Sequence, residues 1–534
     1  MITRFPMCFL FLAIGLAAPI LAPPLHASEA QPAPAPVPAA KRKPNIIVLL
    51  ADDLGVGDLS SYSPVSKIKT PRLDALASQG VRFTDAHSPS SVCTPTRYGL
   101  MTGRYAWRSR LKSGVLGGYS PRLIEPGRET LASMLAKQGY ATGHVGKWHL
   151  GWTWPKAQGE PFGDNIQGFA DDPKSPKDKG NRDRLWSVKW DQPITDGPRA
   201  VGFDYHFGIS ASLDMPPFVY IENDRVVSPP TTVKKWLRHG PAAADFEAVN
   251  VLPDLTRKAI AWIEACAKSD KPFFLYLAYA SPHTPIVPTP EFEGKSGLNP
   301  YGDFVIQTDH DVGALLDALD RLNLTKDTLV VFTADNGCSP AANWEELSRK
   351  GHTPSGPFRG HKADAYEGGH RVPFILRWPG RAPAGAVSDE TLCLTDLYAS
   401  FASIVGVKPA EDAAEDSVDM TTAFEGRKLE APLREATVHH SISGFFAIRQ
   451  GPWKLIFARG SGGWSPPREP EAAKQGLPPI QLYHLGNDPG ERKNLQADHP
   501  DIVQRLTKLL QSYVDQGRST PGAAQKNHRQ VEFK

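Results

Sequence analysis

The segment from Ser91 to Arg104 holds the residue types best suited to chemistry. Its core is a Cys-x-Pro-x-Arg pentapeptide, in which Cys93 precedes Arg97 by four residues. Proline is tolerated in a helix only in the first turn, so the pattern predicts that Cys93 lies at a helix N-terminus. Free N–H groups and the helix dipole favour negative charge there, and Arg97 lies one turn along the same face. A single cysteine is otherwise most often a buried core residue or half of a disulfide.

Carboxylate and amide oxygens follow two apolar runs of the chain. Residues 43–51 form a continuous apolar run that ends in Asp52 and Asp53, and the run 328–334 ends in Asp335 and Asn336. Such runs are typical of central parallel strands, whose carboxyl ends form the ligand-binding edge of an open α/β sheet. Adjacent carboxylates repel each other unless a cation neutralises them, and oxygen ligands suit Ca²⁺ or Mg²⁺. The alternative is a turn with an aspartate cap.

Lysine and histidine residues lie after two further predicted strands and within a glycine-rich loop. The strands are 141–145 and 272–279, and the loop is 355–373. The residues are Lys147, His149, His283 and Lys362. If the backbone stays extended, the side chains of Lys147 and His149 point the same way. Taken singly, each of the four could equally be a surface or turn residue.

The surrounding pattern predicts an α/β protein with a smaller second region. Helices are predicted at 71–78, 128–140, 252–267, 301–323, 394–405 and 502–513, and short antiparallel strands at 437–440, 445–449, 453–457 and 481–484. On the helix 301–323 three aspartates are expected on a solvated face: Asp309, Asp311 and Asp317. Residues 159–197 show no sustained period and are predicted to be a surface excursion. A charged connection at 411–428 divides a region at 43–410 from an α+β region at 411–534.

The first 42 residues predict an exported protein. Arg4, an apolar stretch at 8–21 and small residues near 30 are typical of a signal peptide, here residues 1–30. The apolar stretch is short and followed closely by prolines, so no stable membrane anchor is expected. Residues 31–42 read as a Pro/Ala-rich linker. The net charge of +3 gives no reason to expect a nucleic-acid partner. Five cysteines, one of them in the signal, give no zinc pattern and no framework of disulfides.

In their order and joint presence, these motifs resemble the type I sulfatases, which depend on a formylglycine made from cysteine. The resemblance covers residues 43–495 and lies towards the arylsulfatase A and N-acetylgalactosamine-6-sulfatase branch. It implies an alkaline-phosphatase-like fold: a mixed, mostly parallel sheet sandwiched by helices, with a smaller C-terminal antiparallel sheet-plus-helix domain. It also implies that a formylglycine-generating enzyme converts Cys93 during maturation.

The resemblance assigns a role to each motif residue. One Ca²⁺ would be held by Asp52, Asp53, Asp335, Asn336 and the modified Cys93. Arg97 would orient the formylglycine hydrate, which is the nucleophile, while Lys147 and Lys362 would clamp the sulfate oxygens. His149 would contact the hydrate, and His283 would protonate the leaving oxygen. The expected sugar-pocket residues are Tyr119, His361 and His370.

The resulting expectation is a periplasmic or secreted sulfatase that hydrolyses a sulfate monoester. Its substrate would be a sulfated carbohydrate or an aryl sulfate. One alternative is a phosphonate monoester or phosphodiester hydrolase of the same superfamily, because some relatives share the Cys-x-Pro-x-Arg motif. A second alternative is an inactive sulfatase-like protein that only binds glycans. All the metal and cation positions of the family pattern are present in this chain, which favours the enzyme.

Overall fold

The structure is a computed structural model that describes residues 43–533, apart from 157–161, 165–167 and 170–175. The predicted signal peptide and linker lie outside the described residues. From Lys43 onward the chain forms one compact unit. No described helix combines the length and apolar character needed to cross a membrane.

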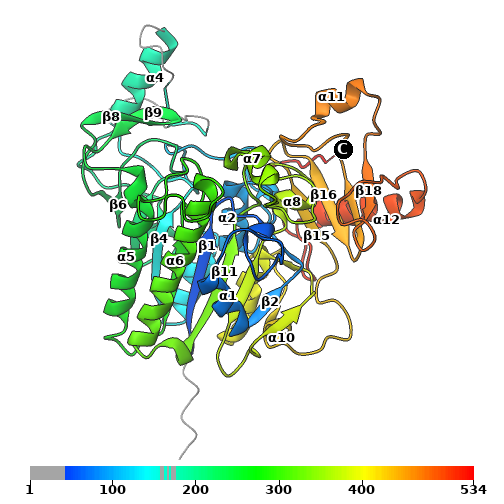
Figure 1. The fold of residues 1–534 in the computed structure, drawn as a ribbon, viewed down its shortest axis with the longest axis horizontal. Helices are drawn as coiled ribbons and strands as arrows, with labels where there is room; N and C mark the ends of the chain where they lie inside the picture. Colours follow the sequence, from blue (N-terminus) through cyan, green and yellow to red (C-terminus); the bar gives the residue numbers. More distant parts are fainter. Residues whose placement is uncertain (1–42, 157–161, 165–167, 170–175, 534) are drawn as a thin grey trace, which may run out of the picture. The chain divides into compact units, whose positions relative to one another are not determined.

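A ten-stranded mixed sheet forms the centre of this unit (Figure 1). In spatial order its strands are β13 (Ala386–Ser388), β2 (Val81–Phe83), β12 (Phe374–Arg377), β11 (Thr328–Ala334), β1 (Asn45–Ala51), β10 (Phe273–Ala278), β4 (Ala141–Lys147), β5 (Tyr205–Ile209), β6 (Ile221–Glu222) and β7 (Arg225–Val226). The five adjacent strands β11, β1, β10, β4 and β5 are parallel to one another, whereas β12 runs antiparallel to β11. The predicted mixed, mostly parallel sheet is therefore confirmed.

The register of the central strands brings the predicted site together. Ala51 of β1 pairs with Ala334 of β11, so the acidic residues that follow both strands emerge side by side. On the other flank β1 pairs with β10, and β10 with β4. Every residue of β1, β10 and β11 is buried, because these apolar runs have both faces covered.

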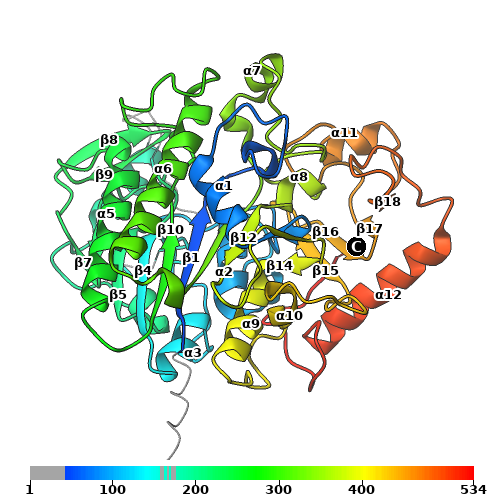
Figure 2. The ribbon, with the colours of Figure 1, turned by 60° about the horizontal axis from the view of Figure 1, so that its bottom comes forward.

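Two groups of helices cover the sheet. One group, seen in front of the strands in Figure 1, contains α1 (Pro71–Ser78), α5 (Ala248–Cys266) and α6 (Pro300–Arg321). The other contains α2 (Cys93–Thr102), α3 (Leu131–Lys137) and α9 (Leu397–Ile404), which contact one another (Figure 2). The predicted helices exist, with ends shifted by a few residues.

One local prediction was wrong, and one helix was not predicted. Asp309 and Asp311 are buried rather than solvated, because α1 and α5 pack on α6; Asp309 accepts hydrogen bonds from the N–H groups of Arg72 and Leu73 and so caps α1. Asp317 is exposed, as expected. The excursion at 159–197 contains a helix, α4 (Pro176–Trp186). Its glycine and many charged residues give it no apolar stripe, which is why the sequence pattern did not reveal it.

The C-terminal region contains the predicted antiparallel sheet. Its strands are β15 (Thr437–His440), β16 (Phe446–Gln450), β17 (Trp453–Ile456) and β18 (Gln481–His484), and α12 (Pro500–Gln516) packs on β16 and β17. Residues between 411 and 428 pack into the core of the large sheet, whereas this small sheet has its own apolar cluster. The boundary at residue 411 stays a prediction.

Short elements complete the described chain. The strands β8 (Thr232–Trp236) and β9 (Arg238–Ala242) form a hairpin, and β3 (Ala86–His87) pairs with β14 (Leu392–Cys393). The remaining short helices are α7 (Trp344–Arg349), α8 (Glu367–His370), α10 (Thr421–Phe424) and α11 (Glu469–Lys474). The four cysteines within the described residues are free thiols, in agreement with the absence of a predicted disulfide framework.

Candidate active site

Helix α2 places Cys93 at the centre of the site. Cys93 is its first residue, and all ten residues of the helix are buried, so the predicted helix N-terminus is confirmed. The Cys93 side chain is itself buried, and burial raises the pKa of its thiol, although Lys147 and Lys362 act in the opposite direction. The thiol is therefore protonated at neutral pH and is a poor nucleophile as it stands.

Four oxygen-bearing side chains meet where β1 and β11 end. The backbone N–H of Asp53 donates to Oδ1 of Asp335 (3.2 Å), and Nδ2 of Asn336 donates to Oδ1 of Asp53 (2.7 Å). Asp52, Asp335 and Asn336 are fully buried, and Asp53 is nearly so. Asp53 also has a positive φ of 65°, a strained conformation for a residue other than glycine. The structure thus brings together all four oxygen ligands predicted from the sequence.

Three buried cations pair with these carboxylates. Arg97 donates twice to Oδ2 of Asp335, at 3.0 and 2.7 Å, and once to the carbonyl oxygen of Lys147. Nζ of Lys147 lies 2.6 Å from Oδ2 of Asp52. Lys362 reaches in from its glycine-rich loop and donates to Asp53 at 2.8 Å. Three carboxylates and three cations therefore balance one another in a region closed to water.

These crowded charges shift the pKa values of Asp52 and Asp335 in opposite directions. For Asp52, burial alone would raise the pKa, but Lys147, His283 and Arg97 together hold that pKa well below its usual range. For Asp335, burial and the negative charge of Asp52 outweigh Arg97 and raise the pKa to about 7. The raised pKa means that the charged form of Asp335 is disfavoured, and any further cation nearby would stabilise that form.

Two histidines complete the cluster. His149 follows β4 with a positive φ of 56°. The prediction that the Lys147 and His149 side chains point the same way required an extended backbone, and the backbone is not extended at His149. Nε2 of His149 lies 2.7 Å from the carbonyl oxygen of Leu116, so this nitrogen carries the proton, and Nδ1 is buried without a hydrogen-bond partner among the described residues. Burial and Lys147 hold the pKa of His149 well below its usual range. His283 lies with Nε2 3.5 Å from Oδ2 of Asp53.

The oxygen cluster fits a hard cation. Oδ1 of Asp52 and Oδ1 of Asn336 are buried and have no hydrogen-bond partner in the described part of the chain. Ligand atoms of Asp52, Asp53 and His283 lie within 4.8 Å of one another. Unpartnered buried oxygens are costly unless something binds them, and an aspartate-asparagine set is the donor chemistry that Ca²⁺ prefers.

Two of the three predicted pocket residues lie in surroundings that leave their role open. The ring of Tyr119 is buried against Trp154 and Phe162, and its hydroxyl group has no partner. His361 is partly exposed beside Lys362, and its Nε2 lies 3.0 Å from Oγ of Ser465. Both assignments stay predictions.

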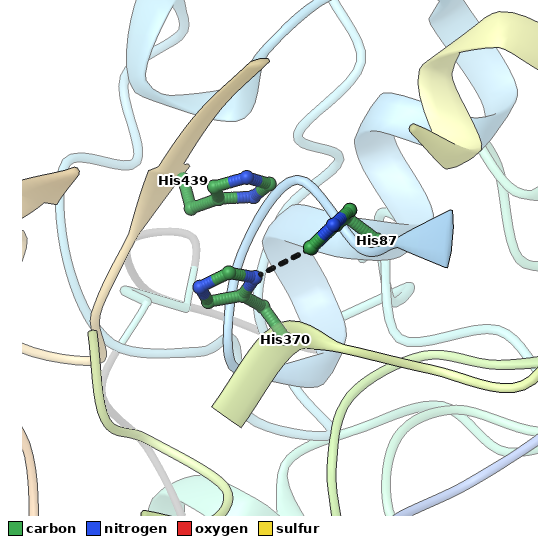
Figure 3. Close-up of side chains that lie close together, drawn as sticks. All are labelled: His87, His370 and His439. Carbon is green, nitrogen blue, oxygen red and sulfur yellow. Dashed lines mark hydrogen bonds between the residues drawn. The ribbon is translucent and has the colours of Figure 1, made fainter. Parts of the chain in front are cut away.

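His370 lies in a buried network of its own, and its assignment to a sugar pocket stays a prediction. It is fully buried and stacks on His439, with ring centroids 3.9 Å apart, while its Nδ1 lies 3.1 Å from Nδ1 of His87 (Figure 3). Its Nε2 is 3.0 Å from Nζ of Lys454. Both of its ring nitrogens therefore have partners within the protein.

The three imidazoles do not form a second metal site, although their nitrogens lie close together. The rings of His370 and His439 are parallel within 9°, so their lone pairs do not converge on one point. Both ring nitrogens of His439 are also hydrogen-bonded, Nδ1 to the carbonyl oxygen of Ser88 and Nε2 to the hydroxyl group of Thr437. The surrounding charges already balance, with three acids and three bases: Asp85, Glu367, Glu491, Arg371, Arg449 and Lys454.

One group beside the site was missed by the sequence reasoning. Asp214, in the loop after β5, lies with Oδ1 4.0 Å from Nδ1 of His283 and forms an ion pair with Arg238. The available signal was the spacing of Ser210, Ser212 and Asp214 directly after a short apolar strand, the same arrangement that revealed Asp52.

Comparison with known proteins gives a consistent result. Residues 44–407 match the family model described as Sulfatase. An N-acetylgalactosamine-6-O-sulfatase of Bacteroides thetaiotaomicron is 34% identical over 515 residues, covering 88% of this chain and 93% of that protein. Human arylsulfatase A is 33% identical over 485 residues, covering 88% of each.

Among solved structures, a Bacteroides thetaiotaomicron protein from work on the metabolism of multiple glycosaminoglycans superposes with a TM-score of 0.74 at 34% identity. The match covers 88% of this chain and 99% of that one. Fold and sequence agree along most of the chain. The chain belongs to the sulfatase family of sulfuric ester hydrolases.

Proposed function

We propose that this enzyme removes the sulfate group from a sulfated glycan, with Cys93 converted to formylglycine and one Ca²⁺ on the oxygen cluster. The observation that carries the proposal is the convergence of Cys93, three cations and unpartnered oxygens of Asp52 and Asn336 at one sheet edge. A buried thiol that stays protonated at neutral pH suits a residue that is modified rather than one that attacks as thiolate.

Two groups outside the twenty amino acids would supply chemistry. The hydrate of formylglycine would provide an oxygen nucleophile that can later release sulfate. Bound Ca²⁺ would provide positive charge to offset the negative charge of the ester. The ion would be held by Asp52, Asp53, Asp335, Asn336 and residue 93. With the three carboxylates already balanced by Arg97, Lys147 and Lys362, a divalent ion would leave the site with a surplus positive charge, which an anionic ester and an ionised hydrate offset.

The side chains of the chain itself hold the ester and move protons. Lys147 and Lys362 bind sulfate oxygens, and Arg97, four residues after residue 93 on α2, holds Asp335 in place. His149 is neutral and has a free Nδ1, so it accepts a proton from the oxygen carried by residue 93. His283 directs Nε2 towards the site and donates the proton that the leaving oxygen requires.

The substrate class and location follow from the relatives and from the N-terminal pattern. Two relatives are named for sulfate esters, one of them on N-acetylgalactosamine, which supports a sulfated carbohydrate substrate here. We infer that the chain is exported to the periplasm or beyond, as residues 1–30 predict, and meets a formylglycine-generating enzyme during maturation.

Two measurements test the proposal. Mass spectrometry of the tryptic peptide containing Cys93, after co-expression with a formylglycine-generating enzyme, should show a lighter species in which the thiol has become an aldehyde. The matured protein should hydrolyse an aryl sulfate faster than the matched aryl phosphodiester. An intact thiol in an active preparation, or a preference for the phosphodiester, would contradict the proposal.

A further inference from the structure

The loop after β5 presents three buried polar atoms. Oγ of Ser210, Oγ of Ser212 and Oδ1 of Asp214 are all buried and have no hydrogen-bond partner within the described residues. A buried polar atom without a protein partner is usually satisfied by water or an ion or has a functional role. Three such atoms within five residues leave this loop with free capacity to bind a water molecule or a polar ligand.

The loop lies against the catalytic residues. The backbone N–H of His149 donates to the carbonyl oxygen of Ser210 at 3.0 Å, so the loop continues the edge of the sheet beside β4. A Cβ atom on Gly118 would come within 2.9 Å of Oγ of Ser210, which places the segment carrying Tyr119 directly against it. Oδ1 of Asp214 lies 4.0 Å from Nδ1 of His283, the proposed donor to the leaving oxygen.

The two oxygens of Asp214 have different partners. Oδ2 forms an ion pair with Arg238 at the start of β9, which fixes the orientation of the carboxylate. Oδ1 has no donor among the described residues, since Nδ1 of His283 already bonds the carbonyl oxygen of Thr284 at 2.6 Å. The Arg238 side chain is 29% exposed, so the pair lies where the buried site meets solvent. A purely structural ion pair would have used both oxygens.

We propose that Asp214 is a specificity-determining residue that accepts a hydrogen bond from a sugar hydroxyl or amide N–H next to the sulfated position. The inference rests on the proposed function, since it names the group that a glycan substrate presents beside His283. An ionised carboxylate accepts hydrogen bonds strongly and repels anions. Asp214 therefore selects substrates with a neutral, hydrogen-bond-donating group beside the ester and disfavours a second sulfate or a carboxylate there.

The test compares Asp214→Asn with wild type on two substrates: a monosaccharide sulfate such as N-acetylgalactosamine 6-sulfate, and an aryl sulfate without hydroxyl groups. Loss of a hydrogen bond to a charged group corresponds to roughly a 10- to 100-fold change. We expect kcat/KM on the sugar sulfate to fall by at least about tenfold more than kcat/KM on the aryl sulfate. Asp224→Asn, an exposed aspartate near Arg199, is the matched control and should change neither.

A deoxy-sugar series identifies the partner. Wild type should lose about tenfold or more on the one deoxy analogue that lacks the recognised group, whereas the loss on the same deletion should be clearly smaller for Asp214→Asn, whose amide oxygen is an uncharged acceptor. Equal losses on both substrates, or an unchanged deoxy penalty in the variant, would overturn the assignment. If Asp214→Asn does not fold, Asp214→Glu, which keeps the charge beside Arg238 but displaces it, carries the same expectation. Wild type that cleaves neither sulfate ester would refute the proposed function itself.

Discussion

Replacing Lys362 with methionine removes one positive charge from the site while keeping the side chain nearly the same size. In the structure Nζ of Lys362 lies 2.8 Å from Oδ2 of Asp53 and is buried, so its charge acts in a region of low dielectric. The negative charge of Asp53 outweighs burial and raises the pKa of Lys362, so the lysine is cationic at neutral pH. Its substitution therefore deletes a full charge that faces the ester.

The size of the effect can be worked from that setting. Two unit charges about 4 Å apart interact by about 4 kcal/mol at an effective dielectric of about 20. That energy corresponds to about a thousandfold in rate, and removal of one preorganised donor from other active sites costs about 10²- to 10³-fold. We expect Lys362→Met to lower kcat/KM for an aryl sulfate by about 10²- to 10³-fold.

Initial rates with matured protein measure this loss, and the exposed Lys326→Met is the charge-matched control. Asp53 keeps its bond from Asn336 at 2.7 Å in the variant, so folding should persist. Because Lys362 competes with a metal for Asp53, the variant should bind Ca²⁺ at least as well as wild type. A loss below about tenfold, or a fall in bound calcium, would refute a role for this charge on the ester.

Two further predictions concern the metal and the buried network behind the site. Exhaustive chelation should lower turnover, and added Ca²⁺ should restore it; unchanged rates in protein shown by metal analysis to be calcium-free would contradict the metal site. Lys454→Met leaves Glu367 and Glu491 without their shared cation, 3.0 and 2.8 Å away, and should cost about 3–5 kcal/mol of unfolding free energy at neutral pH, measured in urea. Burial opposes ionisation of Glu367, but Lys454 helps to hold its pKa at about 2, below the ordinary 4.5, so its stabilising contribution is present above about pH 4.5 and is lost as the pH falls towards 2. The difference in unfolding free energy between wild type and Lys454→Met should therefore become smaller as the pH falls. The exposed Lys474→Met should have the same unfolding free energy as wild type. A difference that is small, or that does not change with pH, would count against this account.

The sequence predicted the fold best where local signals were strong. The strand Thr328–Ala334 and the helix Pro71–Ser78 have the predicted bounds, because an apolar run or a capped periodic stretch is a property of the segment itself. Helix α4 lacks an apolar stripe and was missed. The burial of Asp309 depends on a helix more than two hundred residues away, which no local pattern reports.

The residue types of the site were predictable, but their pairing was not. Asp52, Asp335 and Lys147 each follow a strand of one parallel sheet, so their meeting at one edge follows from topology. The pairing of cations with carboxylates depends on how far each side chain reaches. In the structure Lys147 bonds Asp52, and Arg97 bonds Asp335. The cluster around His370 escaped prediction because its members come from three distant segments that share no motif.

The contrast between the two buried clusters explains why only one of them suits a metal. Behind the site, Oε2 of Glu367 has Nε of Arg371 at 3.3 Å, and Oε1 of Glu491 has Nζ of Lys454 at 2.8 Å. At the sheet edge, Lys147 and Arg97 approach Asp52 through Oδ2, and its Oδ1 has no hydrogen-bond partner in the described residues. An oxygen that keeps a free lone pair among balanced charges can still accept a positive ion.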